Sequence, residues 1–391
     1  MSTCYSNLMS IKLIIIFSTL IFVHTEFIQS QDISYSYQEI FRIGDSEEFD
    51  ENYSFTSPYH IAVGEGGWIY VSDRRLNEIR IFDAEGSFMN KIGERGRGPG
   101  EFNEISSMYI DPSQNHLIVV DRMNLRANRF DMNGKHLDTH LLPEGPVISP
   151  WLGRADVEGN HYLLYRTPVM PNQPRPEEDY LIHIYEPNFT KKTSSAVNAK
   201  LYGELDNYFV DSMIGGPTTG LFEPLKNGQQ LIAAPFIYAG EIYLFENTGD
   251  SWQKMYTLKG VELVGDSFRE IDADNTPDYA IRMGTPRGTL AGLIFSSSIG
   301  IHHVNESIIA HYIHFQDEDH NRGEIGVSLF DITTGKHLGY SKIEELSRDY
   351  QSIRTGWLIQ VKYARDNKIY FVDNRYGEPH VVVAEIMFEL D

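Results

Sequence analysis

The sequence of 391 residues has little cysteine and few basic residues. Its single cysteine, Cys4, lies close to the N-terminus, so the rest of the chain has no thiol for a disulfide or for zinc. The 33 Lys and Arg residues are outnumbered by 55 Asp and Glu, which gives a net charge of −22. Because nucleic-acid binding needs clustered basic side chains, this balance argues against a nucleic-acid partner.

The common catalytic signatures are also absent. The sequence contains neither Gly-x-Ser-x-Gly nor His-Glu-x-x-His. Its one glycine-rich stretch, "KIGERGRGPGEF" (residues 91–102), lacks the Gly-Lys-Ser/Thr that opens a phosphate-binding helix. Glycines for positive φ, a turn proline and a closing Phe102 favour a joint between two pieces of β-structure. The alternative is an anion site made by Arg95, Arg97 and the N–H groups of the loop.

Only one long apolar run is present, Leu13–Val23, and it follows Lys12. Its eleven residues are too few to span a bilayer and are typical of a secretory signal. We therefore expect residues 1–30 to be a signal peptide and residues 31–391 a single exported domain, periplasmic or at the cell surface or beyond it. No stable membrane span is expected after cleavage, and an uncleaved N-terminal anchor is the alternative.

Short runs of β-branched and aromatic residues dominate the remaining chain, which indicates an all-β fold. A repeat is visible in the N-terminal part, where each unit predicts four short strands with a Phe-Asp-turn-Gly hairpin. Four landmark pairs lie 48 residues apart: Asp73 and Asp121, Phe82 and Phe130, Asp83 and Asp131, and Gly86 and Gly134. Four strands per unit of this length are typical of a β-propeller blade.

The recurring hairpin predicts six four-stranded antiparallel blades, centred near residues 58–92, 106–141, 152–196, 219–259, 302–341 and 357–391. The last unit ends at Asp391 with no residues left for a fourth strand. Residues 33–44, which precede the first unit, read as a strand and can supply it. We therefore expect the N-terminal strand to pair within the C-terminal blade and close the ring, which removes exposed sheet edges.

The segment from His60 to Phe102, with "IYVSD", "IRIFD" and "GPGEF", resembles an NHL-type repeat. Together with the signal-like N-terminus, the chain is similar to exported six-bladed β-propeller proteins of Bacteroidota. That resemblance implies a propeller fold, and relatives of similar shape include ligand-binding modules, amidating lyases and lactonases. It does not decide between these functions.

Candidate binding residues are polar side chains on predicted inner strands, at strand ends and in insertions. The carboxylates of Asp73 and Asp121 are expected to accept backbone N–H bonds at turns. Two insertions, 165–180 and 261–295, are expected either to rim a binding face or to be variable surface loops. The candidate ligand-binding residues are His60, Arg75, Arg95, Arg97, Arg122, Tyr165, Arg166, His302, His303 and Arg375.

These features favour a non-catalytic binding or scaffold module for a peptide, a glycan or an envelope protein, without a cofactor. The alternative is a metal-dependent propeller enzyme of the amidating-lyase or lactonase kind, in which histidines from separate blades hold a divalent cation. Against this, neighbouring His302 and His303 are expected on opposite faces of their strand. Histidines in sheets are more often hydrogen-bonded structural residues than metal ligands.

Overall fold

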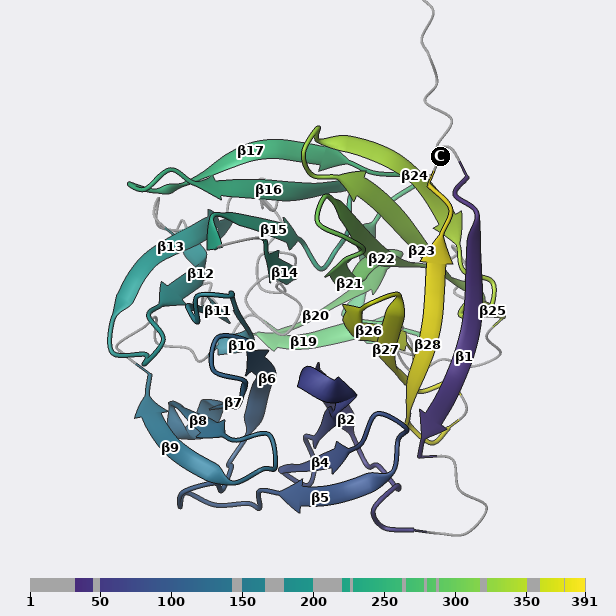
Figure 1. The fold of residues 1–391 in the computed structure, drawn as a ribbon. Coiled ribbons are helices and arrows are strands. Elements are labelled where there is room, and N and C mark those ends of the chain that lie inside the picture. The colour runs from purple at the N-terminus through teal and green to yellow at the C-terminus, as the bar shows by residue number, and fades with distance from the viewer. Residues whose placement is uncertain are drawn as a thin grey trace, which may run out of the picture.

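The computed structural model describes residues 32–44, 50–142, 150–165, 179–199, 220–225, 228–261, 265–277, 280–285, 288–316, 322–349, 359–375 and 377–390. The signal-like segment and Arg166 lie outside these ranges. The described part of the chain is all-β, and its antiparallel sheets stand around a common centre in a propeller-like arrangement (Figure 1). No helix of these ranges has the length and apolar character that crossing a membrane requires.

The first two sheets follow the sequence repeat. One comprises β2 (Pro58–Val63), β3 (Ile69–Asp73), β4 (Glu78–Phe82) and β5 (Phe88–Ile92). The next comprises β6 (Ile105–Asp111), β7 (His116–Asp121), β8 (Arg126–Phe130) and β9 (His136–Leu141). Short 3₁₀ turns, η1 (Glu65–Gly67) and η2 (Arg122–Asn124), follow β2 and β7. The predicted four-stranded units at 58–92 and 106–141 are confirmed.

Four further sheets have four strands along their main path. The third is β10 (Pro150–Ala155), β11 (His161–Tyr165), β12 (Tyr180–Tyr185) and β13 (Lys192–Asn198). The fourth is β14 (Leu221–Pro224), β15 (Gln230–Ala234), β16 (Glu241–Asn247) and β17 (Trp252–Lys259). The fifth is β21 (Ser296–His303), β22 (Ile308–Gln316), β23 (Arg322–Asp331) and β24 (Lys336–Lys342), with β25 (Arg348–Asp349) beside β23. The sixth is β26 (Ile359–Arg365), β27 (Lys368–Asp373), β28 (His380–Phe388) and β1 (Tyr35–Ile43).

A seventh, three-stranded sheet occupies the insertion at 261–295. It comprises β18 (Phe268–Ile271), β20 (Gly288–Ile294) and β19 (Ile281–Thr285), with the 3₁₀ turn η5 (Ala273–Asn275). The repeat pattern predicts no sheet here, only the rim of a binding face or a variable surface loop. This segment carries no Phe-Asp-turn-Gly mark, and the burial along β20 does not alternate, so neither signal identifies its strands in the sequence.

The two ends of the chain meet in the sixth sheet. Strand β1 pairs antiparallel with β28 from Tyr35 opposite Phe388 to Ile43 opposite Val381. Figure 1 shows the purple β1 lying alongside the yellow β28. One register shift, between Glu39 and Phe41, interrupts the ladder. Strand β1 therefore supplies the outer strand that the C-terminal segment lacks.

Hydrophobic clusters fill the spaces between neighbouring sheets. The first and second sheets share a cluster that includes Ile79 and Phe102, and the sixth and first share one that includes Val71 and Val383. Every other consecutive pair of the six larger sheets shares such a cluster. The inner strands also contact one another in the order β2, β6, β10, β14, β21, β26 and again β2. Burial between sheets, on both faces of each, therefore stabilises the arrangement.

The glycine-rich stretch is the joint between β5 and β6, as predicted. Phe102 is fully buried in the cluster between the first two sheets. Gly93 has φ +85°, and a Cβ there would lie 2.3 Å from the Phe102 ring, so no other residue fits. The Arg126 guanidinium donates to the carbonyl oxygens of Arg97, Gly98 and Glu101 at 2.8–2.9 Å.

Candidate functional site

The innermost strand of five of the six larger sheets carries a register shift. Each shift leaves residues without a direct partner on the neighbouring strand, which re-aims their side chains. In β10 the extra residue is Trp151, and in β26 it is Lys362. Bulge residues are prominent in the wall of the central channel: Tyr59, His60, Trp151, Ile299 and Lys362.

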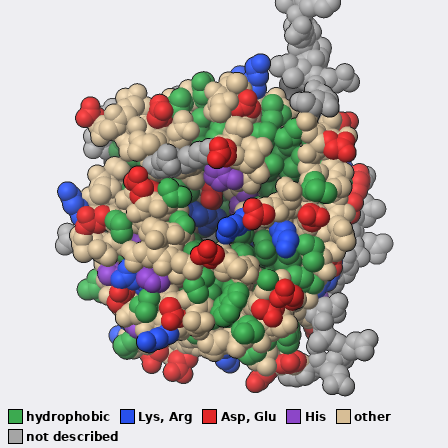
Figure 2. All heavy atoms as spheres, viewed as in Figure 1, with side chains coloured by type: hydrophobic (Ala, Val, Ile, Leu, Met, Phe, Trp, Pro, Cys, Tyr) green, Lys and Arg blue, Asp and Glu red, His purple; other side chains and the backbone are tan. Residues whose placement is uncertain are grey.

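The channel has two compartments. An apolar cavity of about 80 Å³ is bordered by Trp151, Leu152, Leu164, Leu221 and Phe236. A larger polar cavity of about 410 Å³ is bordered by charged and polar side chains of the inner strands and of the turns that follow β2 and β6: Glu65, Asn115, Arg154, Glu223, His302, His303, Lys362 and Arg365. Figure 2 shows basic and histidine side chains in the central hollow, with acidic side chains around it.

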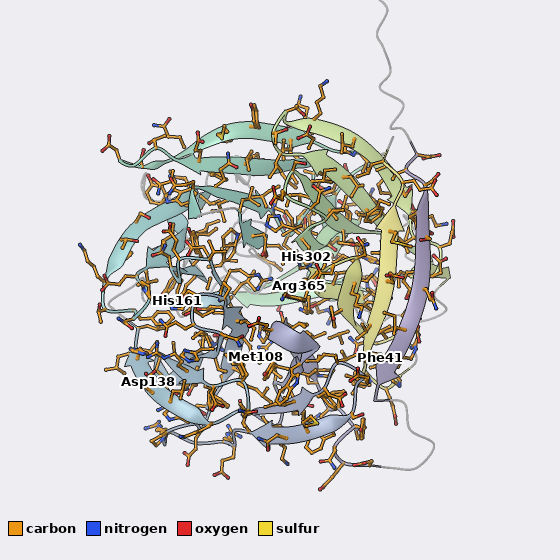
Figure 3. All side chains as sticks on the ribbon, viewed as in Figure 1. Phe41, Met108, Asp138, His161, His302 and Arg365 are labelled. Carbon is orange, nitrogen blue, oxygen red and sulfur yellow. The ribbon has the colours of Figure 1, made fainter. Side chains whose placement is uncertain are left out.

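Five residues border both compartments and define what we call the waist of the channel: Ile61, Met108, Arg154, His302 and Lys362. They come from β2, β6, β10, β21 and β26. Figure 3 places His302 and Met108 at the inner ends of their sheets, facing the centre. The waist therefore contains two cationic side chains, Arg154 and Lys362, in a chain whose net charge is −22.

Arg154 has a carboxylate partner. Its Nε donates to Oε2 of Glu223 on the neighbouring β14 at 3.0 Å, and its Nη1 donates to the Gly153 carbonyl oxygen at 3.0 Å. Its Nη2 makes no hydrogen bond within the described residues. One edge of the guanidinium therefore remains available to an acceptor in the channel.

Lys362 has no carboxylate partner among the residues that the structure describes. Its ammonium donates to Oε1 of Gln360 two residues before it and lies 4.1 Å from the centre of the Tyr59 ring. Burial, and then the positive charges of Arg154 and Arg74, lower the pKa of Lys362 from 10.5 to about 7. Within the described residues, the waist thus holds an amine whose positive charge has no carboxylate beside it.

Aromatic rings link the waist to cations at the strand ends. The Arg74 guanidinium lies 4.4 Å from the centre of the Tyr59 ring, and Arg122 lies 4.3 Å from that of Trp151. Glu104 forms an ion pair with both arginines. Arg122, a predicted site residue, therefore supports the wall of the apolar cavity from behind Trp151.

The predicted histidines do reach the channel, and they also tie blades together. Nε2 of His302 lies 3.2 Å from the Val361 carbonyl oxygen on β26, and Nε2 of His303 lies 3.4 Å from that of Pro224 on β14. The expectation that these two residues point in opposite directions is confirmed. Burial lowers the pKa of His302 to about 3, with a smaller contribution from Arg154, so this ring is neutral.

His60 borders the apolar cavity from β2. Its ring is buried, and its Nε2 has no hydrogen-bond partner among the residues that the structure describes. Burial, followed by the charges of Lys362, Arg74 and Arg154, holds its pKa well below the usual value. Within the described ranges no three His, Cys, Asp or Glu side chains converge as metal ligands would.

Five other predicted site residues that the structure describes do not border the channel. Tyr165 is buried between sheets, with its hydroxyl 2.8 Å from that of Tyr185. Arg375 pairs with Asp373 and donates to the carbonyl oxygens of Glu345 and Leu346, so it connects the fifth and sixth sheets. Three arginines are exposed away from the channel walls: Arg75 near the end of β3, and Arg95 and Arg97 in the joint.

Sequence reasoning missed the two central cations. Lys362 and Arg154 lie in "IQVKYAR" and "PWLGRA", each a charged residue inside a predicted innermost strand. That signal was available, because a charge in a strand enclosed on both faces needs a partner or a cavity. The direction in which each charged side chain points could not be predicted, because bulges break the regular alternation of side chains along these strands.

The family model described as "Domain of unknown function (DUF4934)" matches residues 53–259, more than half of the chain. The chain belongs to this family. The matched range of the DUF4934 protein runs from just before β2 to the end of β17, and so includes the first four sheets. No curated protein matches its sequence.

Two solved structures resemble the DUF4934 chain over most of its length. A member of the DUF4221 family from Bacteroides vulgatus has a TM-score of 0.55 at 10% identity, covering 91% of this chain and 99% of that one. A candidate exported protein from Bacteroides fragilis has a TM-score of 0.52 at 12% identity, covering 94% and 98%. At these identities the likeness concerns the fold alone.

Proposed function

We propose that the chain is an exported, non-catalytic binding module whose ligand carries a carboxylate and occupies the central channel. An acidic peptide, an acidic glycan or a segment of an envelope protein has the required chemistry. The observation that carries this proposal is Lys362, a channel-lining amine with no carboxylate partner within the described ranges. Export is supported by the signal-like run Leu13–Val23.

The architecture of the module is a six-bladed ring with a three-stranded insertion. Six sheets of four strands contact one another in a closed order through β2, β6, β10, β14, β21 and β26. The sheet of β18, β20 and β19 stands outside that order. On this proposal the NHL-like units are blades, and the pairing of β1 with β28 closes the ring.

A half-buried charge without a countercharge destabilises the folded state, and an anion bound beside it offsets that penalty. Arg154 and Lys362 repel one another, and Glu223 neutralises only the first. An anionic group between them supplies the missing countercharge and forms charge-assisted hydrogen bonds. Binding an anion requires no catalytic group in addition to these two cations, so a non-catalytic role is the simpler proposal.

The test is calorimetric titration of the purified protein at pH 6.5 with tetraglutamate and with digalacturonate, using Lys362→Met and a surface control, Lys259→Met. Lys259 is exposed on the outer strand β17. We expect one of these probes to bind, and Lys362→Met to weaken binding at least about tenfold, since a hydrogen bond to a charged group contributes roughly 1.5–3 kcal/mol. Binding that Lys362→Met leaves unchanged, or no binding of any carboxylate, would contradict the proposal.

A further inference from the structure

The apolar compartment next to the waist adds a second requirement on the ligand. Its walls include the side chains of Leu152, Leu164, Leu221 and Phe236. A wall hydroxyl, that of Ser298, already donates to the Pro235 carbonyl oxygen at 2.7 Å and lies 2.9 Å from Nε2 of His311. The buried side-chain atoms of this wall that lack a hydrogen bond within the described residues are two ring nitrogens, Nε2 of His60 and Nε1 of Trp151. They can satisfy at most two of the hydrogen bonds that a hydroxyl-rich sugar ring makes to water, so such a ring is a poorer fit than an aliphatic group.

The charged and apolar features are adjacent, because Arg154 and Lys362 border both compartments. A carboxylate held at the waist therefore has an apolar cavity on one side and the polar cavity on the other. The side chain of a carboxyl-terminal residue can enter the first while the preceding chain extends through the second. This geometry matches a carboxylate bonded close to an apolar group.

The size of the apolar compartment limits that group. Its volume of about 80 Å³ is smaller than the roughly 150 Å³ of an engineered apolar cavity that binds benzene. A branched aliphatic group of three or four carbons fits such a space better than an aromatic ring. The polar compartment, at about 410 Å³, has room for the rest of a short peptide.

We propose that the channel binds a carboxylate carrying a branched aliphatic group, with the carboxylate between Arg154 and Lys362 and the aliphatic group in the apolar compartment. This inference rests on the proposed function and specifies its ligand. Two sources share the chemistry: the carboxyl terminus of a peptide that ends in Leu, Ile or Val, and a free branched-chain carboxylic acid. Met108 and Ile61 complete the apolar part of the waist.

The experiment is a calorimetric titration at pH 6.5 with four probes: acetyl-Ala-Ala-Leu with a free carboxylate, its carboxyl amide, acetyl-Ala-Ala-Gly, and isovalerate. We expect the Leu peptide to bind at least about thirtyfold more tightly than the Gly peptide, because each buried methylene contributes roughly 0.8 kcal/mol. The amide should bind at least about tenfold more weakly than the free peptide. Binding of isovalerate but not of the Leu peptide would support the inference with the free acid as source.

Two variants test the apolar compartment and the cationic waist separately. Leu221→Phe adds volume at the apolar wall and should remove the preference for Leu over Gly, whereas Lys362→Met should weaken both peptides. If Leu221→Phe misfolds, the affinities of the unaltered protein for the Leu and Gly peptides still test the inference. Equal affinities for the Leu and Gly peptides would overturn the inference. If tetraglutamate alone binds and depends on Lys362, the inference fails while the proposed function stands.

Discussion

The Lys362 ammonium lies 4.1 Å from the centre of the Tyr59 ring, and the Arg74 guanidinium lies 4.4 Å from the same point. Two cations therefore share one aromatic ring at the edge of the waist. The electron-rich face of a ring compensates a cation only in part, by roughly 0.5–2 kcal/mol. Arg74 also has Glu104, at 3.5 Å, whereas the partners of Lys362 among the described residues are the ring and the Gln360 amide.

Replacing Lys362 by Met should stabilise the protein. A methionine fills nearly the same space and removes the cost of desolvating an amine that has no carboxylate partner among the described residues. Urea unfolding monitored by circular dichroism gives the difference, with Lys259→Met as the control expected to change stability by less than about 0.5 kcal/mol. A Lys362→Met protein that is markedly less stable would assign Lys362 a structural role instead.

The stability difference between the parent and Lys362→Met should depend on pH. The folded-state pKa of Lys362, about 7, lies below its ordinary value of 10.5, so between these values only the unfolded chain binds the proton. The parent therefore gains stability relative to the variant as pH rises from about 7 to 10.5. Urea midpoints of both proteins, measured at intervals through this pH range, test the sign of this pH dependence. A stability difference between parent and variant that does not change with pH would refute it.

Carboxylate binding should weaken as pH rises above neutrality. The anion stabilises the charged form of Lys362, so binding raises its pKa and takes up a proton. Affinity should be constant between about pH 5 and pH 6, where the ligand carboxylate stays ionised, then fall by up to about tenfold per pH unit above about pH 7. Calorimetric titrations in buffers of different ionisation enthalpy measure the number of protons taken up on binding. Affinity that rises with pH would exclude Lys362 as the group that binds the anion.

The repeated Asp at the end of the second strand should be a major stability determinant. Asp73 is fully buried, and its carboxylate accepts bonds from the backbone N–H groups of Thr56, Ser57, Arg75 and Leu76 at 2.6–3.2 Å. The predicted turn-capping role is confirmed. Asp73→Ala should cost about 2–4 kcal/mol in urea unfolding, because buried donors lose their acceptor.

A matched control for this prediction is Asp83→Ala in the same sheet. Asp83 accepts from the N–H groups of Glu85 and Ser87 in a solvent-accessible turn, where water can replace the carboxylate. Its loss should cost less than about 1 kcal/mol. Equal destabilisation by the two substitutions would show that burial of the carboxylate is not what matters.

Removing residues 31–44 should destabilise the fold and expose an edge of β28. Strand β1 pairs along β28 from Tyr35 to Ile43, and Phe41 packs with buried Ile43 against the cluster between the sixth and first sheets. Losing this strand should lower the free energy of unfolding by several kcal/mol and promote aggregation. Adding a synthetic peptide of residues 32–44 should restore part of the stability. A truncated chain that unfolds at the same urea concentration would contradict the closing role of β1.

Much of the fold was predictable because it rests on local and repeated signals. The 48-residue spacing from Asp73 to Asp121 identifies the unit, and the strand pattern of residues 33–44 indicates the partner that β28 has in the sixth sheet. The three-stranded sheet at 261–295 was not predictable in this way. It occurs once, so no second copy in the chain marks its strands.

The site was less predictable, because it is made by contacts between blades. His60, His302 and His303 were found because they lie on inner strands. Tyr165 follows the same alternation but faces the buried space between sheets. Lys362 faces the channel only through the bulge between Val361 and Tyr363, a feature of backbone register that residue types do not reveal.

Metal analysis distinguishes the binding module from a metal-dependent enzyme. Nε2 of His302 already lies 3.2 Å from a carbonyl oxygen, and Arg154 and Lys362 beside it would repel a divalent cation. We expect mass spectrometry of the native protein, prepared without chelator, to find no metal at one equivalent. A stoichiometric metal that His60→Ala or His302→Ala removes would favour the enzyme.

The pKa of the Lys362 amine is the most direct measure of the channel as an anion site. Selective ¹³C labelling of lysine permits NMR titration of each ε-carbon, and Lys362→Met identifies the resonance. We expect the Lys362 resonance to titrate near pH 7 in the free protein and at higher pH with saturating acetyl-Ala-Ala-Leu. A Lys362 resonance that titrates near 10.5 in the free protein, or that the peptide leaves unmoved, would contradict it.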